Sequence, residues 1–271
     1  MIVISILDLL SYRFFQNALL GGVIAAATCA AVGLFLILKK EAMIGDGIAH
    51  TAFGGIALGL FLGINPLMSA LAVSVLAVLG ISYMRRKKIA PSDSAIAVML
   101  ALGFSFGLIV ISIAQGFNIE LFSYLFGSIL TIDEVDLMVV SILGVFVLLF
   151  LGLFRRELLS LVFDEEDSRV MGIPTSTLSL AFDLLVATTI VLSIKVIGTV
   201  LVVALLVLPG LSALQLNLSF RQTILLAVGF STSSTVLGIL FSAIFDVATS
   251  GLIVFTSVLL FLLTIAYKKL Q

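Results

Sequence analysis

Long apolar runs follow one another along the chain, and each is close to the length that a helix needs to cross a membrane. About 20 helical residues cover the ~30 Å hydrocarbon core of a bilayer. Backbone groups in that core have no water to bond, so they must be paired within a helix or a closed barrel. The runs lack the apolar–polar alternation of barrel strands. The sequence therefore predicts an all-α, polytopic transmembrane bundle.

Composition agrees, because only 11% of the 271 residues are charged, against about 25% in soluble domains. We predict about nine spans, with eight or ten as alternatives because two neighbouring runs have almost no linker between them. The stretch Ile119–Ile132 is shorter and predicts a re-entrant or interfacial helix. We treat residues 1–271 as one transmembrane domain. The predicted spans are Phe14–Leu38, Ala42–Leu62, Pro66–Met84, Ser94–Ala114, Val135–Phe154, Thr177–Ile194, Ile197–Leu214, Thr223–Ile244 and Ala248–Tyr267.

Several function classes are disfavoured. The net charge of −1 and the lack of a basic patch with interleaved aromatics argue against nucleic-acid binding. The single cysteine, Cys29, excludes a disulfide framework and a thiolate metal cluster. The sequence contains no G-x-x-x-x-G-K-[ST], H-E-x-x-H or G-x-S-x-G motif. We therefore expect a chain that is not an enzyme, in which any ATP hydrolysis belongs to a partner.

The basic residues predict an orientation, because cytoplasmic loops carry an excess of Lys and Arg. With the N-terminus outside and the C-terminus cytoplasmic, all of the 14 basic residues except Arg13 and Lys195 lie on the cytoplasmic side. The opposite orientation would put nearly all of them outside. We therefore expect a multi-pass protein of the cell membrane with a cytoplasmic C-terminus.

The longest polar segment, Arg155–Ser176, falls on the predicted cytoplasmic side. Within it, Leu158–Phe163 predicts a short interfacial helix. Asp164–Asp167 can start a second helix, because carboxylates stabilise a helix N-terminus, and Gly172 with Pro174 would end it. The segment is either a docking point for another protein or an ordinary solvated loop.

The stretch MIGDGIAHTAFGGIALGLFLG, residues 43–63, carries the most chemistry. Asp46 and His50, the only histidine, are four residues apart, so both project from one face of a helix. Ionisable residues within a span are costly and are candidates for function, and carboxylate with imidazole suits Zn²⁺ or Mn²⁺. Two ligands are too few for a tight site, but a two-fold dimer would supply four. Alternatively, Asp46 caps the span and His50 bonds a carbonyl.

Other residues are open to two interpretations. Asp183, a second carboxylate within a span, either lines a pathway or pairs with a nearby polar group. Pro209 marks a helix break, as a gate element or as a plain kink. Gly55, Gly59 and Gly63 recur every four residues, a pattern that favours close helix packing.

Four segments together resemble the membrane permease subunit of bacterial ABC importers for zinc and manganese. They are LILKKEAMIGDGIAHTAFGGIALG, YLFGSILTI, VFDEEDSRVMGIP and GTVLVVALLVLPGLSA, in family order from about Ser11 to the chain's end. The basic pair Lys39-Lys40 and Gly210 depart from the usual pattern. Lys195 and Asp183 match no family role. The YLFGSILTI and FDEED segments favour the zinc branch slightly.

The resemblance implies a type II importer-like permease that carries Zn²⁺ or Mn²⁺ as a transported ion, with no permanently bound cofactor. It implies that Asp46 and His50 coordinate the metal. It also implies that a coupling segment at about residues 155–176 docks on the ATPase, through Phe163, Asp164, Glu165, Glu166 and Gly172. The implied partners are a second copy of the chain, cytoplasmic ATPase subunits and an external metal-binding protein, all in membrane lipid.

Two other classes of function stay open. A secondary cation transporter or channel would use Asp46, His50 and Asp183 as an ion or proton relay and would need no ATPase. A non-transporting membrane scaffold would tolerate the loss of Asp46 and His50.

The predicted orientation leads to a labelling experiment. Cysteines placed near Lys87 and near Ser168 should react only with membrane-permeant reagents in intact cells, while one near Asp133 should react with impermeant reagents. Impermeant labelling near Lys87 would contradict the orientation.

Overall fold

The structure is a computed structural model that describes residues 11–114, 119–127, 134–245 and 247–270. These residues form helices joined by turns, without a strand among them, so the all-α prediction is confirmed. The longer helices are α2 (Arg13–Leu38), α3 (Met43–Leu62), α4 (Pro66–Arg86), α5 (Ser92–Ile113), α7 (Glu134–Leu153), α10 (Thr175–Ile197), α11 (Thr199–Leu214), α12 (Phe220–Phe245) and α13 (Thr249–Leu270). The short helices are α6 (Ile119–Phe126), α8 (Arg155–Phe163) and α9 (Glu165–Val170).

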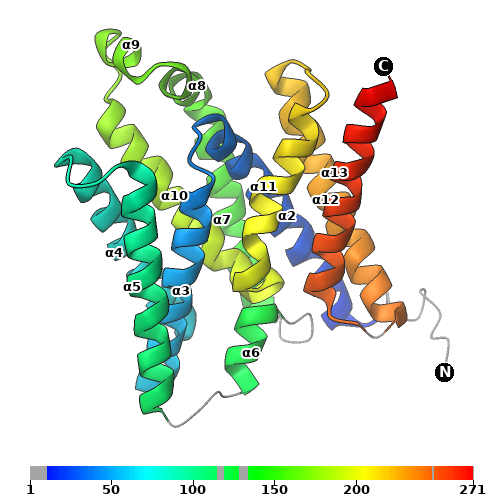
Figure 1. Ribbon diagram of the computed structural model, residues 1–271. Coiled ribbons are helices and arrows are strands. Elements are labelled where there is room, and N and C mark those ends of the chain that lie inside the picture. The colour runs from blue at the N-terminus through cyan, green and yellow to red at the C-terminus, as the bar shows by residue number, and fades with distance from the viewer. Residues whose placement is uncertain (1–10, 115–118, 128–133, 246, 271) are drawn as a thin grey trace.

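Within the described residues, eight helices are long and apolar enough to cross a membrane. Helix α11 is shorter, with 16 residues, or about 24 Å at 1.5 Å per residue. The chain reverses between α10 and α11 at Gly198, whose φ of +92° favours glycine. Figure 1 shows α11 running back to the end of the bundle that carries α8 and α9. The predicted stretch Ile197–Leu214 is therefore a separate helix, but a short one.

The helix ends lie on two opposite faces of the bundle. One face carries α8, α9, the α4–α5 turn and the end of α13, and we call it the α8–α9 face (Figure 1). The opposite face carries α6 and the first turns of α2 and α7. Lys87 and α9 therefore share a face, as the basic-residue count predicts. Asp133 lies outside the described residues, and Glu134 beside it begins α7 on the opposite face.

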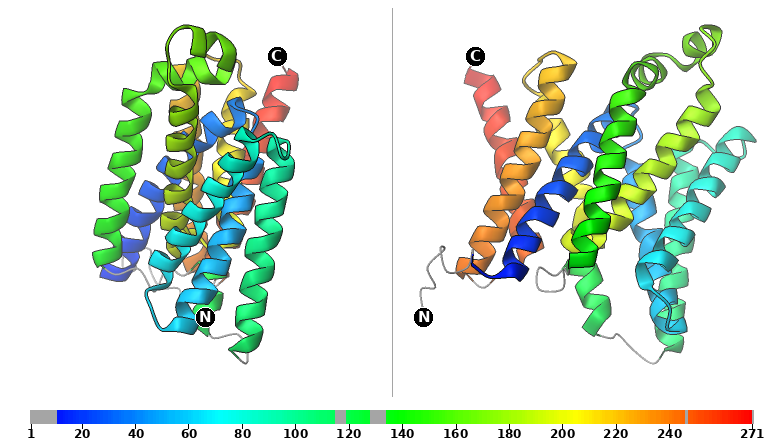
Figure 2. Two further views of the ribbon diagram at one scale, coloured as in Figure 1. Left: turned by 90° about the vertical axis from the view of Figure 1, so that its left-hand side faces the viewer. Right: turned by 180° about the vertical axis from the view of Figure 1, so that it is seen from behind.

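Burial divides the helices into an inner and an outer group. Most residues of α2, α3 and α10 are buried, whereas most residues of α5, α7 and α13 are not. The exposed side chains of these outer helices are mainly large and apolar, as a surface in contact with lipid requires. Figure 2 shows α7 and α13 along the margins of the bundle.

The glycine stripe of α3 packs inside the chain. A Cβ on Gly55 would lie 2.6 Å from the Cα of Ala70, and one on Gly59 would lie 2.7 Å from the Cα of Pro66. These glycines let α3 and α4 approach closely, so the packing interpretation is confirmed. Gly63 has a different task, because its φ of +67° ends α3.

Helix α11 continues through Pro209 to Leu214, so the proline does not end the helix, and the gate and kink interpretations stay predictions. Proline removes one backbone donor and crowds the preceding turn, but tertiary packing holds the helix together. Gly210 follows directly, and a Cβ there would lie 2.7 Å from the Ile37 side chain of α2. The Pro-Gly pair thus lies in a close contact between α11 and α2.

Candidate functional site

Asp46 and His50 project from the same face of α3, near its first turn. His50 Nε2 lies 3.5 Å from Asp46 Oδ1, and the two side chains are 36% and 38% exposed. From Ile44 to Ala57, a stretch that the structure describes completely, they are the only residues not buried. The only accessible part of this inner helix stretch therefore consists of a carboxylate and an imidazole.

The structure also bears on the alternative roles of this pair. The N-cap of α3 is Ala42, without a side-chain cap, and Asp46 lies in the first turn, where its charge favours the helix N-terminus without a capping hydrogen bond. His50 contacts the edge of Phe104, with 5.2 Å between ring centroids. Helix α3 also continues unbroken past Gly45 and Gly47. Both polar side chains keep atoms free for a ligand.

The spacing of the pair suits a shared divalent ion. Two ligand atoms about 2.1 Å from a tetrahedral ion lie roughly 3.4 Å apart, close to the 3.5 Å between Oδ1 and Nε2. Within the described part of the chain, no group of three or more His, Cys, Asp or Glu side chains is placed to hold a metal. The described part of one chain therefore places this pair alone, which is fewer than the three or four protein ligands that a stable site needs.

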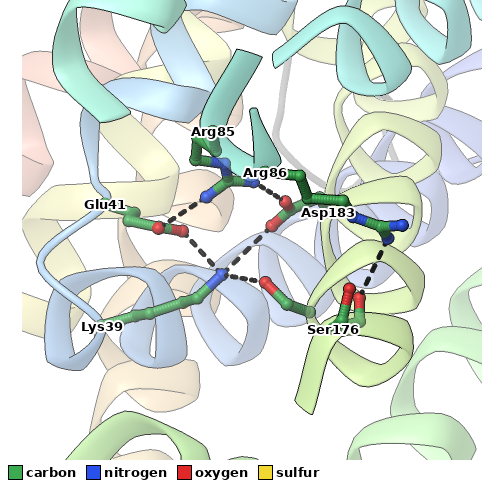
Figure 3. Close-up of polar contacts among 7 residues, drawn as sticks. Lys39, Glu41, Arg85, Arg86, Ser176 and Asp183 are labelled. Carbon is green, nitrogen blue, oxygen red and sulfur yellow. Dashed lines mark hydrogen bonds and ion pairs between the residues drawn. The ribbon is translucent and has the colours of Figure 1, made fainter. Parts of the chain in front are cut away.

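A second cluster of charges lies where α2, α4 and α10 come together at the α8–α9 face. We call Lys39, Glu41, Arg85 and Asp183 the ion quartet (Figure 3). Glu41 Oε2 is 2.7 Å from Lys39 Nζ, and Glu41 Oε1 is 2.7 Å from Arg85 Nη1. Asp183 pairs with Arg85 and lies 3.3 Å from Lys39 Nζ. Two cations thus alternate with two anions in a closed ring.

The ion quartet explains how a carboxylate is tolerated inside α10. The Asp183 side chain is fully buried, and the other three members of the quartet are 12 to 19% exposed. The four charges sum to zero, and Ser179 accepts a further hydrogen bond from Lys39 at 2.9 Å. Asp183 therefore pairs with nearby polar groups and does not line an open pathway. The Thr188 hydroxyl bonds its own helix, at the Leu184 carbonyl.

Sequence reasoning found Asp183 but not its partners. The available signal was that a lone carboxylate within a span requires a cation, and that Lys39 and Arg85 end two other spans on the same face. Many basic residues lie on that face, and the partners of Asp183 can be identified among them only when the positions of the helices are known. Lys195 is explained in the same way, because it pairs with Asp136 of α7.

The segment after α7 forms two short helices, as predicted. Asp164 caps α9, since its Oδ1 accepts hydrogen bonds from the backbone N–H of Glu166 at 2.8 Å and of Asp167 at 3.0 Å. Gly172, with a φ of +85°, follows the last turn. The hydroxyls of Ser160 and Ser168 lie 2.7 Å apart and connect α8 to α9.

The tip of this segment exposes apolar side chains. Phe163 is 82% exposed, Val170 88% and Met171 70%. Three large apolar groups beside a highly charged helix are typical of an interaction surface. Val170 and Met171 were not expected from the sequence, because the apolar positions of so short a helix show no period.

Known proteins are similar to this chain over nearly its whole length. Residues 11–268 match the ABC 3 transport family, so the chain belongs to that family. A manganese transport system membrane protein of Halalkalibacterium halodurans is 33% identical over 97% of this chain and 90% of its own length. A probable iron transport system membrane protein of Haemophilus influenzae is 30% identical, and 98% of each chain is covered.

A solved structure is also similar. PsaBC from Streptococcus pneumoniae, determined in complex with Fab, matches with a TM-score of 0.86 and 31% identity, over 96% of this chain and 93% of that one. The fold is thus that of a membrane subunit of an ABC transporter.

The ion quartet leads to a stability prediction. Asp183→Ala leaves Lys39 and Arg85 with one anion, and an uncompensated buried charge costs about 3–5 kcal/mol. The melting midpoint of the purified chain in detergent should therefore fall clearly. The control is Glu134→Gln, which breaks an ion pair with Arg13 whose side chains are 73% and 85% exposed and should change the midpoint little. Equal midpoints for the two variants would contradict a stabilising quartet.

Proposed function

We propose that this chain is the permease subunit of an importer that moves a divalent transition-metal ion into the cell. The observation that carries the proposal is the Asp46–His50 pair, the one accessible part of an otherwise buried stretch of α3. Family membership and the names of the relatives support the same function. The chain itself catalyses no covalent chemistry.

The proposed ion site is shared between two copies of the chain. Each copy offers Asp46 and His50 at a separation that suits one ion, and a two-fold axis would bring two carboxylates and two imidazoles together. A site divided between chains can also be opened by moving the chains apart, which a transport cycle requires. This dimer is part of the proposal.

For the transported ion we propose Mn²⁺ or Zn²⁺. Carboxylate oxygens suit Mn²⁺ and imidazole suits Zn²⁺, and Zn²⁺ binds a given site more tightly than Mn²⁺. The sequence slightly favours zinc, whereas the relative from Halalkalibacterium halodurans is named for manganese, so the proposal keeps both ions. Manganese selection would then rest on delivery and on the geometry of the assembled site more than on affinity.

The proposed arrangement puts the α8–α9 face in the cytoplasm, with the N-terminus outside. There Phe163 and the capped helix α9 would dock on an ATPase subunit, because the segment combines exposed apolar groups with charge. The residues assigned to coupling from the sequence, Asp164, Glu165, Glu166 and Gly172, lie in or beside α9. An external metal-binding protein would deliver the ion at the opposite face.

The rival reading, a secondary transporter or channel with a relay through Asp46, His50 and Asp183, is not favoured. Asp183 is fully buried and paired with Arg85 and Lys39, so it has no free site for an ion or a proton. Membership of an ABC family also points to ATP as the energy source.

The proposal is tested by radiometal uptake in vesicles that contain the whole reconstituted assembly. Asp46→Asn removes the charge, and His50→Ala removes the imidazole. Changes in groups that only support metal ligands typically cost about 10–100-fold in affinity, so either variant should lower uptake at limiting metal by at least about tenfold. Uptake is normalised to folded permease. Glu134→Gln, which removes a carboxylate from the first turn of α7, should transport normally.

Near-normal uptake by both variants would refute the metal site. Uptake that followed a proton gradient and did not require ATP would instead favour the relay.

A further inference from the structure

A second feature of the α8–α9 face is a cavity of about 760 Å³ beside the ion quartet. Its walls come from the end of α4, the start of α5, helices α8 and α9, and the first turns of α10. The cavity is lined by five basic residues but only two acidic ones. Its positive charge would repel a metal cation, and neither Asp46 nor His50 lines it.

Most of the lining charges are already neutralised by one another. Lys39 and Arg85 belong to the ion quartet, and Arg169 lies 3.3 Å from Glu165. Arg86 and Lys88 take part in none of the ion pairs that the described residues form. Arg86 donates a 3.4 Å hydrogen bond to the Ser176 carbonyl (Figure 3), and a carbonyl leaves its charge uncompensated. Two positive charges therefore face the cavity without an anion.

The start of α5 adds neutral donors. Ser92 lines the cavity, and its hydroxyl is shielded from solvent without a hydrogen-bond partner in the described residues. Ser92 is also the first residue of α5, whose N-cap, Pro91, provides no side-chain cap. First-turn N–H groups and the helix dipole favour an anion at such an end, and Asp93 of the first turn meets only part of that preference because it makes no capping hydrogen bond. Two cations and these donors thus face the same cavity. Such a combination is typical of a phosphate-binding site.

The level of the cavity in the membrane identifies the source of the phosphate. Helix α4 has 21 residues and is about 31 Å long, close to the thickness of the hydrocarbon core. Arg86, its last residue, therefore lies where lipid headgroups begin. Leu161 and Val162 of α8 add apolar surface to the same cavity. Basic pockets at this depth between transmembrane helices bind anionic headgroups.

We propose that this cavity binds the phosphate of an anionic phospholipid, held by Arg86 and Lys88 with a hydrogen bond from Ser92. The bound lipid would join the α4–α5 turn to the α8–α9 segment. This inference does not depend on the proposed metal site.

The test is native mass spectrometry of the full-length chain in detergent, with phosphatidylglycerol or phosphatidylcholine of the same acyl chains added. The unmodified chain should retain phosphatidylglycerol preferentially. Arg86→Gln combined with Lys88→Gln should lower that retention roughly 25-fold, since each basic residue near an anionic lipid contributes about fivefold. Elution as a single folded species on gel filtration is required of every variant.

Two controls separate the site from general surface charge. Lys87→Gln removes the same charge from the same turn, but Lys87 does not line the cavity. Lys268→Gln with Lys269→Gln removes two charges from the end of α13 on the same face. Both controls should keep near-normal retention.

Equal loss in the controls, or full retention in the Arg86 and Lys88 variant, would overturn the proposal. Binding of inorganic phosphate without a preference for phosphatidylglycerol over phosphatidylcholine would overturn the lipid as its source.

Discussion

The ion quartet at the α8–α9 face is the interaction on which the position of α3 depends. A buried carboxylate on α10 is costly in a membrane protein unless cations reach it, and Arg85 of α4 and Lys39 of α2 do so. Glu41 completes the ring, and its backbone carbonyl accepts a 3.0 Å hydrogen bond from Ile44 at the start of α3. The same residue therefore connects the charges to the first turn of the helix that carries Asp46.

Close packing then determines which part of α3 a ligand can reach. Glycines bring α3 against α5 as well as α4, since a Cβ on Gly54 would lie 2.4 Å from the Gly103 carbonyl oxygen. Such contacts help to bury every residue from Ile44 to Ala57 except Asp46 and His50. Asp46 and His50 stay accessible on its remaining face, and a polar pair there is stable only with a partner, an ion or water. The packing of α3 thus leaves the candidate pair as its accessible part.

The sequence was sufficient to predict the helices and to place the two residues of the candidate pair on one helix face. Run length and the absence of alternation identify spans, and an i, i+4 spacing puts Asp46 and His50 on one face whatever surrounds them. The capped helix α9 was also predictable, because capping is a local property of Asp164 and its neighbours.

The remaining features depend on contacts between distant segments. The pairing of Asp183 with Arg85 and Lys39 joins residues separated by 98 and 144 positions. The cavity at Arg86 and Lys88 exists only because the α4–α5 turn lies opposite α8 and α9. Pro209 is a further case: the local rule predicts a break, whereas α11, which packs against α2, continues through it.

We propose that two chains share one transported ion. The metal content of the purified dimeric permease tests this sharing most directly. It is measured by inductively coupled plasma mass spectrometry after equilibrium dialysis against Mn²⁺ or Zn²⁺. We predict one tightly bound ion per two chains, absent from the Asp46→Asn protein. One ion per chain, or an unchanged content in Asp46→Asn, would contradict the shared site.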